Sequence, residues 1–294
     1  MSLGMAFGSS GLCRVVSGPA YGRQELGYAP GGPADRFAAW VGNTMLEQDR
    51  DAEALEVVHL PEARFVEPTW FVMSGAPRLR PRLLCNGSSA EVPLEHAVVY
   101  YAEAGDRLML GRPIRGLRTY VCTRPNTGER LEKLAGRRRP AFEDICQTFD
   151  ADGAIRITPG PEHDSLVSPR NLWDTTWRVT REMSDVGLRL EPAVEKDEKA
   201  EALPEADPPE ITSGPVADGT VQLTPAGPLV LMRQRPTLGG YPRIGTVIDV
   251  DIDRLAQYAP GHVVRWRCVS VEEAVRWYRQ REEDLALLIE AVRG

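Results

Sequence analysis

The stretch PLVLMRQRPTLGGYPRIGTVIDVDIDRLAQYAPGHVVRWRCVS, residues 228–270, decides the fold that we expect. Its apolar runs at residues 229–232 and 244–250 contain no turn-forming residue and are typical of strands that enter a core. Residues 263–269 alternate apolar with charged side chains, which is the period of a half-buried strand. The intervening residues 255–258 are too few for more than a helical turn. The stretch therefore predicts a β-rich core.

A glycine-rich loop joins the first two of these strands. It contains Gly239 and Gly240, followed by Tyr241 and Pro242. Glycines let a ligand approach the backbone closely and expose its N–H groups, although they also simply form tight turns. We interpret the loop as one wall of a binding cleft.

The composition narrows the classes of function. The chain has 294 residues, 42% of them hydrophobic, and a formal net charge of −7. A nucleic-acid partner is not expected, because the only basic run, residues 137–139, is typical of a solvated loop. No apolar run of about 18 residues and no secretory signal is present, so we expect a cytoplasmic protein without a membrane partner. The five cysteines and four histidines lack metal-binding spacing, so no metal site is expected.

Outside the opening stretch, short apolar runs separated by turns predict further strands, typical of a barrel or sandwich. Residues 17–35 are typical of a long ordered loop in which Tyr21, Leu26 and Tyr28 are expected to be buried. Asp35 is interpreted as the N-cap of an amphipathic helix of about 12 residues, in preference to a catalytic acid.

The C-terminal part contains two further predicted features. Residues 191–210 are acidic and proline-rich, which predicts a mobile surface loop. Residues 271–292 have helical periodicity, and Ser270 and Glu273 are placed as a capping box at the start of that helix.

Several motifs occur in a fixed order along the chain. Residues 26–37 read LGYAPGGPADRF and residues 155–164 read IRITPGPEHD. The others are ALE at 54–56, SGA at 74–76, GLRL at 187–190, SG at 213–214, GTVQ at 219–222, GGYP at 239–242, RLAQ at 254–257, PG at 260–261 and VR at 264–265. Their order and spacing resemble the allophanate hydrolase subunit 2 family, also called the biotin-dependent carboxyltransferase family. That family includes the C-type subunit of 5-oxoprolinase, the Kip-type antagonist and the carboxyltransferase part of urea carboxylase.

The resemblance implies a mainly β fold of two cyclophilin-like β-barrel halves, at residues 6–150 and 151–270, with few helices and a C-terminal helix at 271–294. It implies that a small carboxylate or amide substrate binds in a cleft between the halves. The implied substrate-binding residues are Gly31, Gly32, Asp35, Gly239, Gly240, Tyr241 and Arg243. It also implies a paired B-type partner of related fold, with ATP used by the full complex to open 5-oxoproline and no cofactor bound by this chain alone.

No catalytic residue follows from the resemblance. His163 and Asp164 are candidates for acid–base chemistry, but adjacent residues are not expected to face one another, and a loop of solvated charges is the alternative.

Three departures from the family pattern keep other functions open. Residues 13–20 read CRVVSGPA where the family has TxQDxGR, and residues 123–140 are shorter than the family's middle segment. In the glycine loop the family's QTTGGYPK becomes PTLGGYPR, with changes at Pro236, Leu238 and Arg243. Arginine stays protonated and prefers a planar bidentate partner, so Arg243 suits a carboxylate clamp or a salt bridge at the rim, not proton transfer. The alternatives are a non-catalytic binding or regulatory relative, and the carboxyltransferase component of a biotin-dependent carboxylase.

Overall fold

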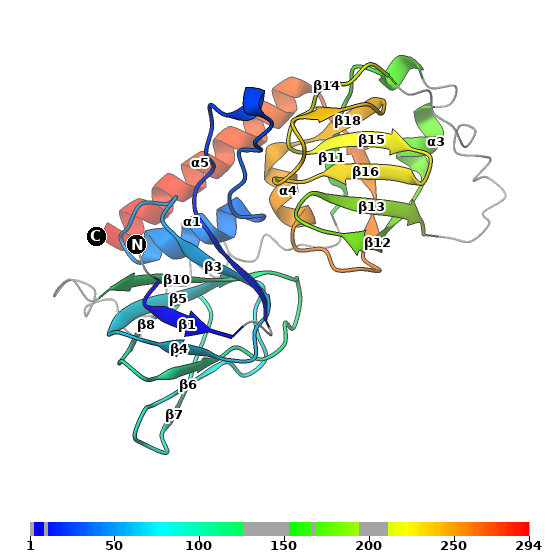
Figure 1. The fold of residues 1–294 in the computed structure, drawn as a ribbon. Helices are drawn as coiled ribbons and strands as arrows, with labels where there is room; N and C mark the ends of the chain where they lie inside the picture. The colour runs from blue at the N-terminus through cyan, green and yellow to red at the C-terminus, as the bar shows by residue number, and fades with distance from the viewer. Residues whose placement is uncertain (1–2, 9–10, 126–152, 166–168, 194–210, 294) are drawn as a thin grey trace. The chain divides into compact units, whose positions relative to one another are not determined.

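A computed structural model describes the chain except residues 1–2, 9–10, 126–152, 166–168, 194–210 and 294 (Figure 1). The basic run at 137–139 and most of the predicted loop at 191–210 therefore lie outside the described residues. The chain forms two compact units, each with its own core. Unit 1 comprises Met1–Gly18, Asp35–Phe149 and Glu282–Gly294, and unit 2 comprises Pro19–Ala34 and Asp150–Arg281. The predicted mainly β fold is confirmed.

Unit 1 contains two five-stranded antiparallel sheets. In spatial order the first is β1 (Met5–Phe7), β4 (Ala63–Phe65), β9 (Arg107–Met109), β6 (Arg82–Leu84) and β7 (Glu91–Pro93). The second is β2 (Leu12–Val16), β3 (Ala54–His59), β10 (Thr119–Pro125), β5 (Thr69–Gly75) and β8 (Val99–Ala102). Every residue of β5 is buried, because alternate side chains enter two different clusters, Phe71 and Met73 in one and Trp70 and Val72 in the other.

Helix α1 (Arg36–Met45) confirms the predicted helix and its cap. The Asp35 carboxylate accepts a hydrogen bond from the Ala38 N–H at 2.9 Å. The helix has the expected amphipathic pattern, and all ten of its residues are buried. Leu285 and Leu288, from the C-terminal end of helix α5 (Val271–Arg293), belong to the same buried cluster as α1.

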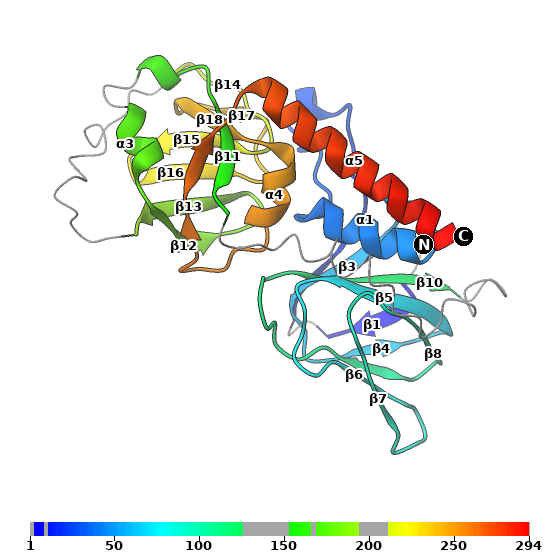
Figure 2. The same ribbon diagram turned by 180° about the vertical axis from the view of Figure 1, so that it is seen from behind.

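Unit 2 contains an eight-stranded sheet that nearly closes into a barrel. In spatial order its strands are β19 (Val263–Val264), β12 (Trp177–Met183), β13 (Gly187–Pro192), β16 (Gly227–Leu231), β15 (Thr220–Thr224), β18 (Arg243–Val247), β11 (Ile155–Pro159) and β20 (Trp266–Cys268). The two ends of the sheet, β19 and β20, are separated in sequence by Arg265 alone. One extended segment therefore pairs with β12 at one end and with β11 at the other (Figure 2). The predicted strand at 263–269 is confirmed in this divided form.

The segment after β18 corrects the sequence prediction. The strand ends at Val247, and residues Asp249–Leu255 form helix α4, so the strand expected to reach residue 250 is wrong. The turn expected at 255–258 is present, since the Tyr258 N–H donates to the Leu255 carbonyl at 3.0 Å, but it follows directly on α4. Ile252 and Leu255 are buried three positions apart, as on one helix face, and Asp249 and Asp251 in the first turn favour a helix N-terminus.

The described parts contain several smaller elements. They are the 3₁₀ turns η1 (Gln24–Leu26) and η3 (His163–Ser165), helix α3 (Pro169–Asp174), and the strand pair β14 (Gly214–Pro215) and β17 (Leu238–Gly239). Helix α5 begins with the predicted capping box, since the Glu273 N–H donates to Ser270 Oγ at 3.2 Å and the Ser270 N–H donates to the Glu273 carboxylate at 2.9 Å. No helix in the described ranges is long and apolar enough to cross a membrane.

The long loop before α1 is ordered as predicted, but its large side chains are not buried. Tyr21, Leu26 and Tyr28 are each about two-thirds exposed, at 65%, 69% and 64%. The loop folds back on itself, because the Ala20 N–H donates to the Pro30 carbonyl at 2.8 Å. Its tip therefore faces solvent, and the buried part is the segment that follows this neck.

Candidate functional site

The glycine loop and the loop at residues 160–164 lie together in unit 2. The Gly160 N–H donates to the Ile244 carbonyl at 3.0 Å, and the Glu162 N–H donates to the Arg243 carbonyl at 3.3 Å. A Cβ atom at Gly160 would overlap the Arg243 carbonyl oxygen, so only glycine allows this approach. The close packing of the two loops thus depends on backbone contact at Gly160.

Gly239 and Gly240 also allow close approach of neighbouring groups. Gly239 lies in β17 opposite Gly214, and a Cβ atom there would overlap the Gln222 side-chain amide. That amide donates to the Tyr241 carbonyl at 3.2 Å. The loop is therefore anchored to β15 through Gln222. Tyr241 is half-buried, and whether it stacks on a ligand stays a prediction.

Arg243 forms a two-point ion pair with Glu162. Its Nε and Nη2 donate to the two carboxylate oxygens at 2.9 and 2.6 Å, and its backbone N–H donates to the same carboxylate at 2.9 Å. Nη1 donates to the Pro215 carbonyl at 3.0 Å. The hydrogen bonds from Arg243 lower the pKa of Glu162. The bidentate geometry expected of Arg243 is therefore present, with a carboxylate of the chain itself as the partner.

His163 is engaged at both ring nitrogens. Trp173 Nε1 can only donate, and it donates to His163 Nε2 at 2.8 Å, so the ring proton lies on Nδ1 and is donated to Asp164 at 3.0 Å. The two rings also stack, with centroids 5.6 Å apart. The expectation that these adjacent side chains do not face one another is thus wrong, because the 3₁₀ turn η3 brings His163 and Asp164 together. The carboxylate of Asp164 itself is fully exposed.

The predicted residues at the end of the long loop fall into different units. Gly31 and Gly32 belong to unit 2 and have left-handed backbones, with φ of 68° and 95°. A Cβ atom at Gly31 would lie 3.0 Å from the side-chain nitrogen of Gln234. Asp35 belongs to unit 1 and is buried, with its side chain used as the N-cap of α1. Their role as substrate-binding residues stays a prediction.

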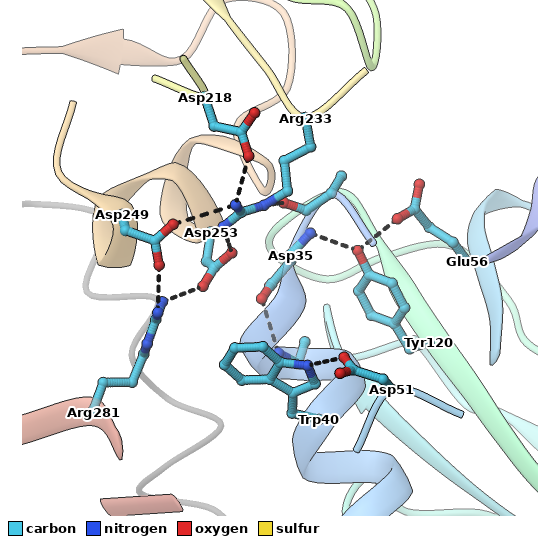
Figure 3. A network of polar contacts seen from close by, with 12 residues as sticks. Asp35, Trp40, Asp51, Glu56, Tyr120, Asp218, Arg233, Asp249, Asp253 and Arg281 are labelled. Atoms are coloured by element: carbon cyan, nitrogen blue, oxygen red, sulfur yellow. Dashed lines mark hydrogen bonds and ion pairs between the residues drawn. The ribbon is translucent and has the colours of Figure 1, made fainter. Parts of the chain in front are cut away.

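Unit 2 also contains a buried ion network that sequence reasoning missed (Figure 3). Arg233, which is 1% exposed, donates to Asp253 at 2.7 Å, to Asp218 at 3.3 Å and to Asp249 at 3.4 Å. Arg281 binds the second carboxylate oxygen of Asp249 and of Asp253, the oxygen that Arg233 does not contact. Burial opposes the charge, but the three carboxylates outweigh it and raise the pKa of Arg233. The signal in the sequence was the row of charges at residues 249, 251 and 253 inside an apolar run.

A second buried network lies in unit 1. The Tyr120 hydroxyl donates to Glu56 at 2.7 Å and accepts a hydrogen bond from the Asp35 N–H at 2.8 Å. Arg14 Nε donates to the other oxygen of Glu56 at 3.0 Å. Burial and the neighbouring carboxylates of Glu56 and Asp35 raise the pKa of Tyr120 well above its ordinary value. The hydroxyl therefore stays protonated and acts as a fixed hydrogen-bond relay.

The described residues contain no group of three His, Cys, Asp or Glu side chains arranged to hold a metal ion. Within unit 2 the structure brings together Gly160, Glu162, His163, Gly240 and Arg243. This arrangement contains a guanidinium paired with a carboxylate, polar backbone and an imidazole engaged at both ring nitrogens. Ligand binding by these residues stays a prediction.

Comparison with known proteins shows which family the chain matches. A family model described as the carboxyltransferase domain, subdomain A and B, matches residues 26–136 and 127–268. The C-type subunit of the 5-oxoprolinase of Escherichia coli (strain K12) is 26% identical over 298 residues, which cover 89% of this chain and 90% of that protein. A putative urea carboxylase of Emericella nidulans is 24% identical over 89% of this chain but only 24% of its own length.

Solved structures show the same fold. The Kluyveromyces lactis urea carboxylase superposes with a TM-score of 0.77 at 17% identity, covering 94% of this chain and 28% of that one. The protein TTHA0988 has a TM-score of 0.68 at 22% identity over 90% of this chain, which spans about half, 55%, of its length. At these identities the likeness supports the fold alone.

Proposed function

Because the chain belongs to the family of carboxyltransferase domains, subdomains A and B, we propose that it is a subunit of a hydrolase complex of the 5-oxoprolinase type. The observation that carries the proposal is the matched extent of the two chains. The C-type subunit of the E. coli 5-oxoprolinase aligns over 90% of its length with 89% of this chain, whereas the urea carboxylases align over 24% and 28% of theirs. The expected partner is a paired B-type subunit of related fold.

The proposed ligand is a small carboxylate or cyclic amide such as 5-oxoproline. Hydrolysis of this ring breaks the lactam C–N bond and forms a C–O bond to water, which gives glutamate. The ATP used for this reaction is assigned to the full complex, and this chain alone is expected to bind no cofactor. The expected ligand contacts are the glycine loop with Tyr241, together with Gly31, Gly32 and Asp35.

Arg243 supplies the positive charge for a ligand carboxylate in this proposal. Its Nε–Nη2 edge now binds Glu162, so a ligand carboxylate would have to replace Glu162 on that edge. His163 has both ring nitrogens engaged, which favours a binding role over proton transfer for this loop.

The proposal is tested with the assembled complex. Co-expression with the paired B-type protein should give ATP-dependent formation of glutamate from 5-oxoproline. In the isolated chain, 5-oxoproline should raise the melting temperature, and Arg243→Ala should abolish this shift. The control is Arg189→Ala, which removes a comparable surface arginine that pairs with Glu182 at 2.8 Å. An assembled complex without turnover contradicts the proposal.

The second candidate is a carboxyltransferase component, and the family model together with the K. lactis fold match favours it. Biotin would then be supplied by a partner. Carboxyl transfer from carboxybiotin, measured in the same preparation, distinguishes it from ring hydrolysis. Stabilisation by ligands without either reaction would indicate the third function, that of a binding or regulatory relative.

A further inference from the structure

The side chain of Gln234 lies directly against the backbone of Gly31, and both residues belong to unit 2. A Cβ atom at Gly31 would lie 3.0 Å from the side-chain nitrogen of Gln234 and 3.3 Å from its oxygen. Both polar ends of the carboxamide therefore lie side by side over Gly31, whichever of the two atoms is the nitrogen. Gly31 also has a left-handed backbone, with φ of 68°, so its conformation and this close contact both favour glycine.

The backbone that carries Gln234 is fixed. Its own N–H donates to the Asp185 carbonyl at 3.0 Å. The residues on either side, Arg233 and Arg235, are 1% and 7% exposed, and both form ion pairs with Asp218, at 3.3 and 2.9 Å. Because its two neighbours turn toward Asp218, the side chain of Gln234 projects away from them and toward Gly31.

A second contact holds the segment that contains Gly31 in place. Arg233 Nε donates to the Ala34 carbonyl at 3.3 Å, and Ala34 is part of the buried apolar cluster of unit 2. Together with the contact of Gln234 at Gly31, this hydrogen bond keeps residues 31–34 alongside residues 233–234. The carboxamide of Gln234 therefore has a defined position.

This carboxamide is not used within the fold. Gln234 is half-buried, but its side chain makes no hydrogen bond to any residue that the structure describes. The Gln222 carboxamide in the same unit, by contrast, donates to the Tyr241 carbonyl at 3.2 Å. Polar groups shielded from water are normally hydrogen-bonded, so both ends of the Gln234 carboxamide are available to a ligand.

The chemistry of a carboxamide indicates which ligand fits. It presents a donor and an acceptor on the same edge. A lactam does the same, because its ring holds the amide in the cis form, whereas an ordinary secondary amide is trans and presents the two groups on opposite sides. A lactam can thus form a pair of hydrogen bonds with Gln234, and a trans amide can form only one.

We propose that Gln234 is a binding residue that recognises the amide group of the ligand and selects cyclic amides by pairing with both the N–H and the carbonyl of the ring. The choice of 5-oxoproline as the ligand rests on the proposed function, whereas recognition of a cyclic amide by Gln234 does not.

Matched ligands test the pairing in the full chain by calorimetric titration. They are 5-oxoproline, 2-pyrrolidinone, which keeps the lactam but lacks the carboxylate, and cyclopentanecarboxylate, which lacks the amide. Gln234→Met keeps the length of the side chain and removes both polar groups. It should weaken binding of the two lactams about tenfold, since two hydrogen bonds are lost, and leave cyclopentanecarboxylate within about twofold of wild type. Equal weakening of all three ligands, or none, overturns the proposal.

Gln48→Met is the matched control. The Gln48 carboxamide is used within unit 1, where it donates to Asn43 Oδ1 at 2.9 Å and to the Thr123 carbonyl at 3.2 Å. This variant should lower the midpoint of urea unfolding and leave every ligand affinity within about twofold of wild type. Gln234→Met should do the reverse. A midpoint for Gln234→Met that falls as far as that of Gln48→Met would show a structural role instead.

The side-chain NH₂ signals of Gln234 in NMR spectra report the contact directly, and they are identified by their absence in Gln234→Met. Both lactams should shift these signals, and cyclopentanecarboxylate should not. N-methylacetamide, a trans amide, should need about fivefold more ligand for the same shift as 2-pyrrolidinone.

The same spectra separate this inference from the proposed function. If 2-pyrrolidinone moves the Gln234 signals but 5-oxoproline does not bind, the proposed function fails and the amide site stands. If 5-oxoproline binds and the Gln234 signals do not move, the amide site is wrong and the proposed function stands. If neither lactam binds, both are wrong.

Discussion

Arg78 in unit 1 and Arg233 in unit 2 are both almost completely buried, at 3% and 1% exposed, but their surroundings differ. Arg78 donates to the Val57 carbonyl and to Thr119 Oγ1, both at 2.6 Å, and to the Val58 carbonyl at 3.1 Å. No carboxylate of the described chain lies within ion-pair distance of it. Arg233 instead binds three aspartates. Burial lowers the pKa of Arg78 to about 10, whereas the carboxylates raise that of Arg233.

The difference shows two ways to compensate a buried cation. Neutral oxygens satisfy the hydrogen bonds of Arg78 but do not cancel its charge, so part of the desolvation cost persists in the folded state. Around Arg233 the charge is cancelled, but its removal would take a cation away from three carboxylates, of which Asp253 is buried. The two sites should therefore respond differently to the same substitution.

The largest effect is expected for Arg233→Met. It removes one of the cations that bind Asp218, Asp249 and Asp253, and breaking a buried pair in this way typically costs about 3–5 kcal/mol of unfolding free energy. Urea titration at pH 7 measures this value. Arg189→Met, at an ion pair whose carboxylate partner Glu182 is exposed, should cost less than about 1 kcal/mol. Equal losses in both variants would mean that the network around Arg233 does not stabilise unit 2.

The next largest effect is expected in the pH dependence of the stability of unit 1. The Arg78 backbone N–H donates to His96 Nε2 at 3.0 Å, and burial together with the Arg78 charge lowers the pKa of His96 to about 4 from 6.5. The unfolded chain then binds more protons, so the stability contribution is complete above pH 6.5 and is lost as the pH falls toward 4. The full shift in the pKa of His96 corresponds to at most about 3 kcal/mol of unfolding free energy.

His96→Gln isolates this contribution, because glutamine can still accept the Arg78 hydrogen bond but does not titrate. The difference in unfolding free energy between wild type and variant should shrink between pH 6.5 and 4. A difference that is constant over this range would contradict the assignment to His96.

Contacts between residues far apart in the sequence, such as those of Arg233, mark the limit of what the sequence could predict. Local patterns were sufficient for Asp35 as a helix cap, for Ser270 with Glu273, and for most strands, since each depends on neighbours within about four residues. Helix α4 was missed because alternating aspartate and apolar residues also fit the period of a strand.

The networks could not be predicted for a different reason. Arg233 meets Asp218 and Asp253, which are 15 and 20 residues away in sequence, and no local rule assigns such partners. Exposure of Tyr21 and Tyr28 likewise depends on where the loop neck closes, at Ala20 and Pro30. Charged residues inside apolar runs were the only available signal for buried ion pairs.

A smaller loss of stability is expected for Arg78→Met. The lost hydrogen bonds leave buried carbonyls of Val57 and Val58 without this donor, but removal of an uncompensated charge offsets part of that cost. We expect a net loss of about 2 kcal/mol by urea titration at pH 7, roughly half that of Arg233→Met. In the same background the pKa of His96 should move back toward 6.5, which NMR titration of the ring can follow. A loss as large as that of Arg233→Met would mean that charge compensation does not separate the two sites.

The smallest effect is expected at the surface counterpart of these sites, the pair of Arg243 and Glu162. Both side chains are 21% exposed, so water screens the pair, and Glu162→Gln should cost no more than about 1 kcal/mol. Because Arg243 lowers the pKa of Glu162, the stability it contributes is present above the ordinary carboxyl pKa and is lost as the pH falls through the lowered value. Glu162→Gln should also strengthen binding of 5-oxoproline in thermal-shift titrations, since it weakens the competitor for the guanidinium edge. Glu182→Gln, which weakens the corresponding pair of Arg189, should not. If Glu162→Gln destabilises unit 2 as strongly as Arg233→Met, the pair is a structural bridge and not an exchangeable contact.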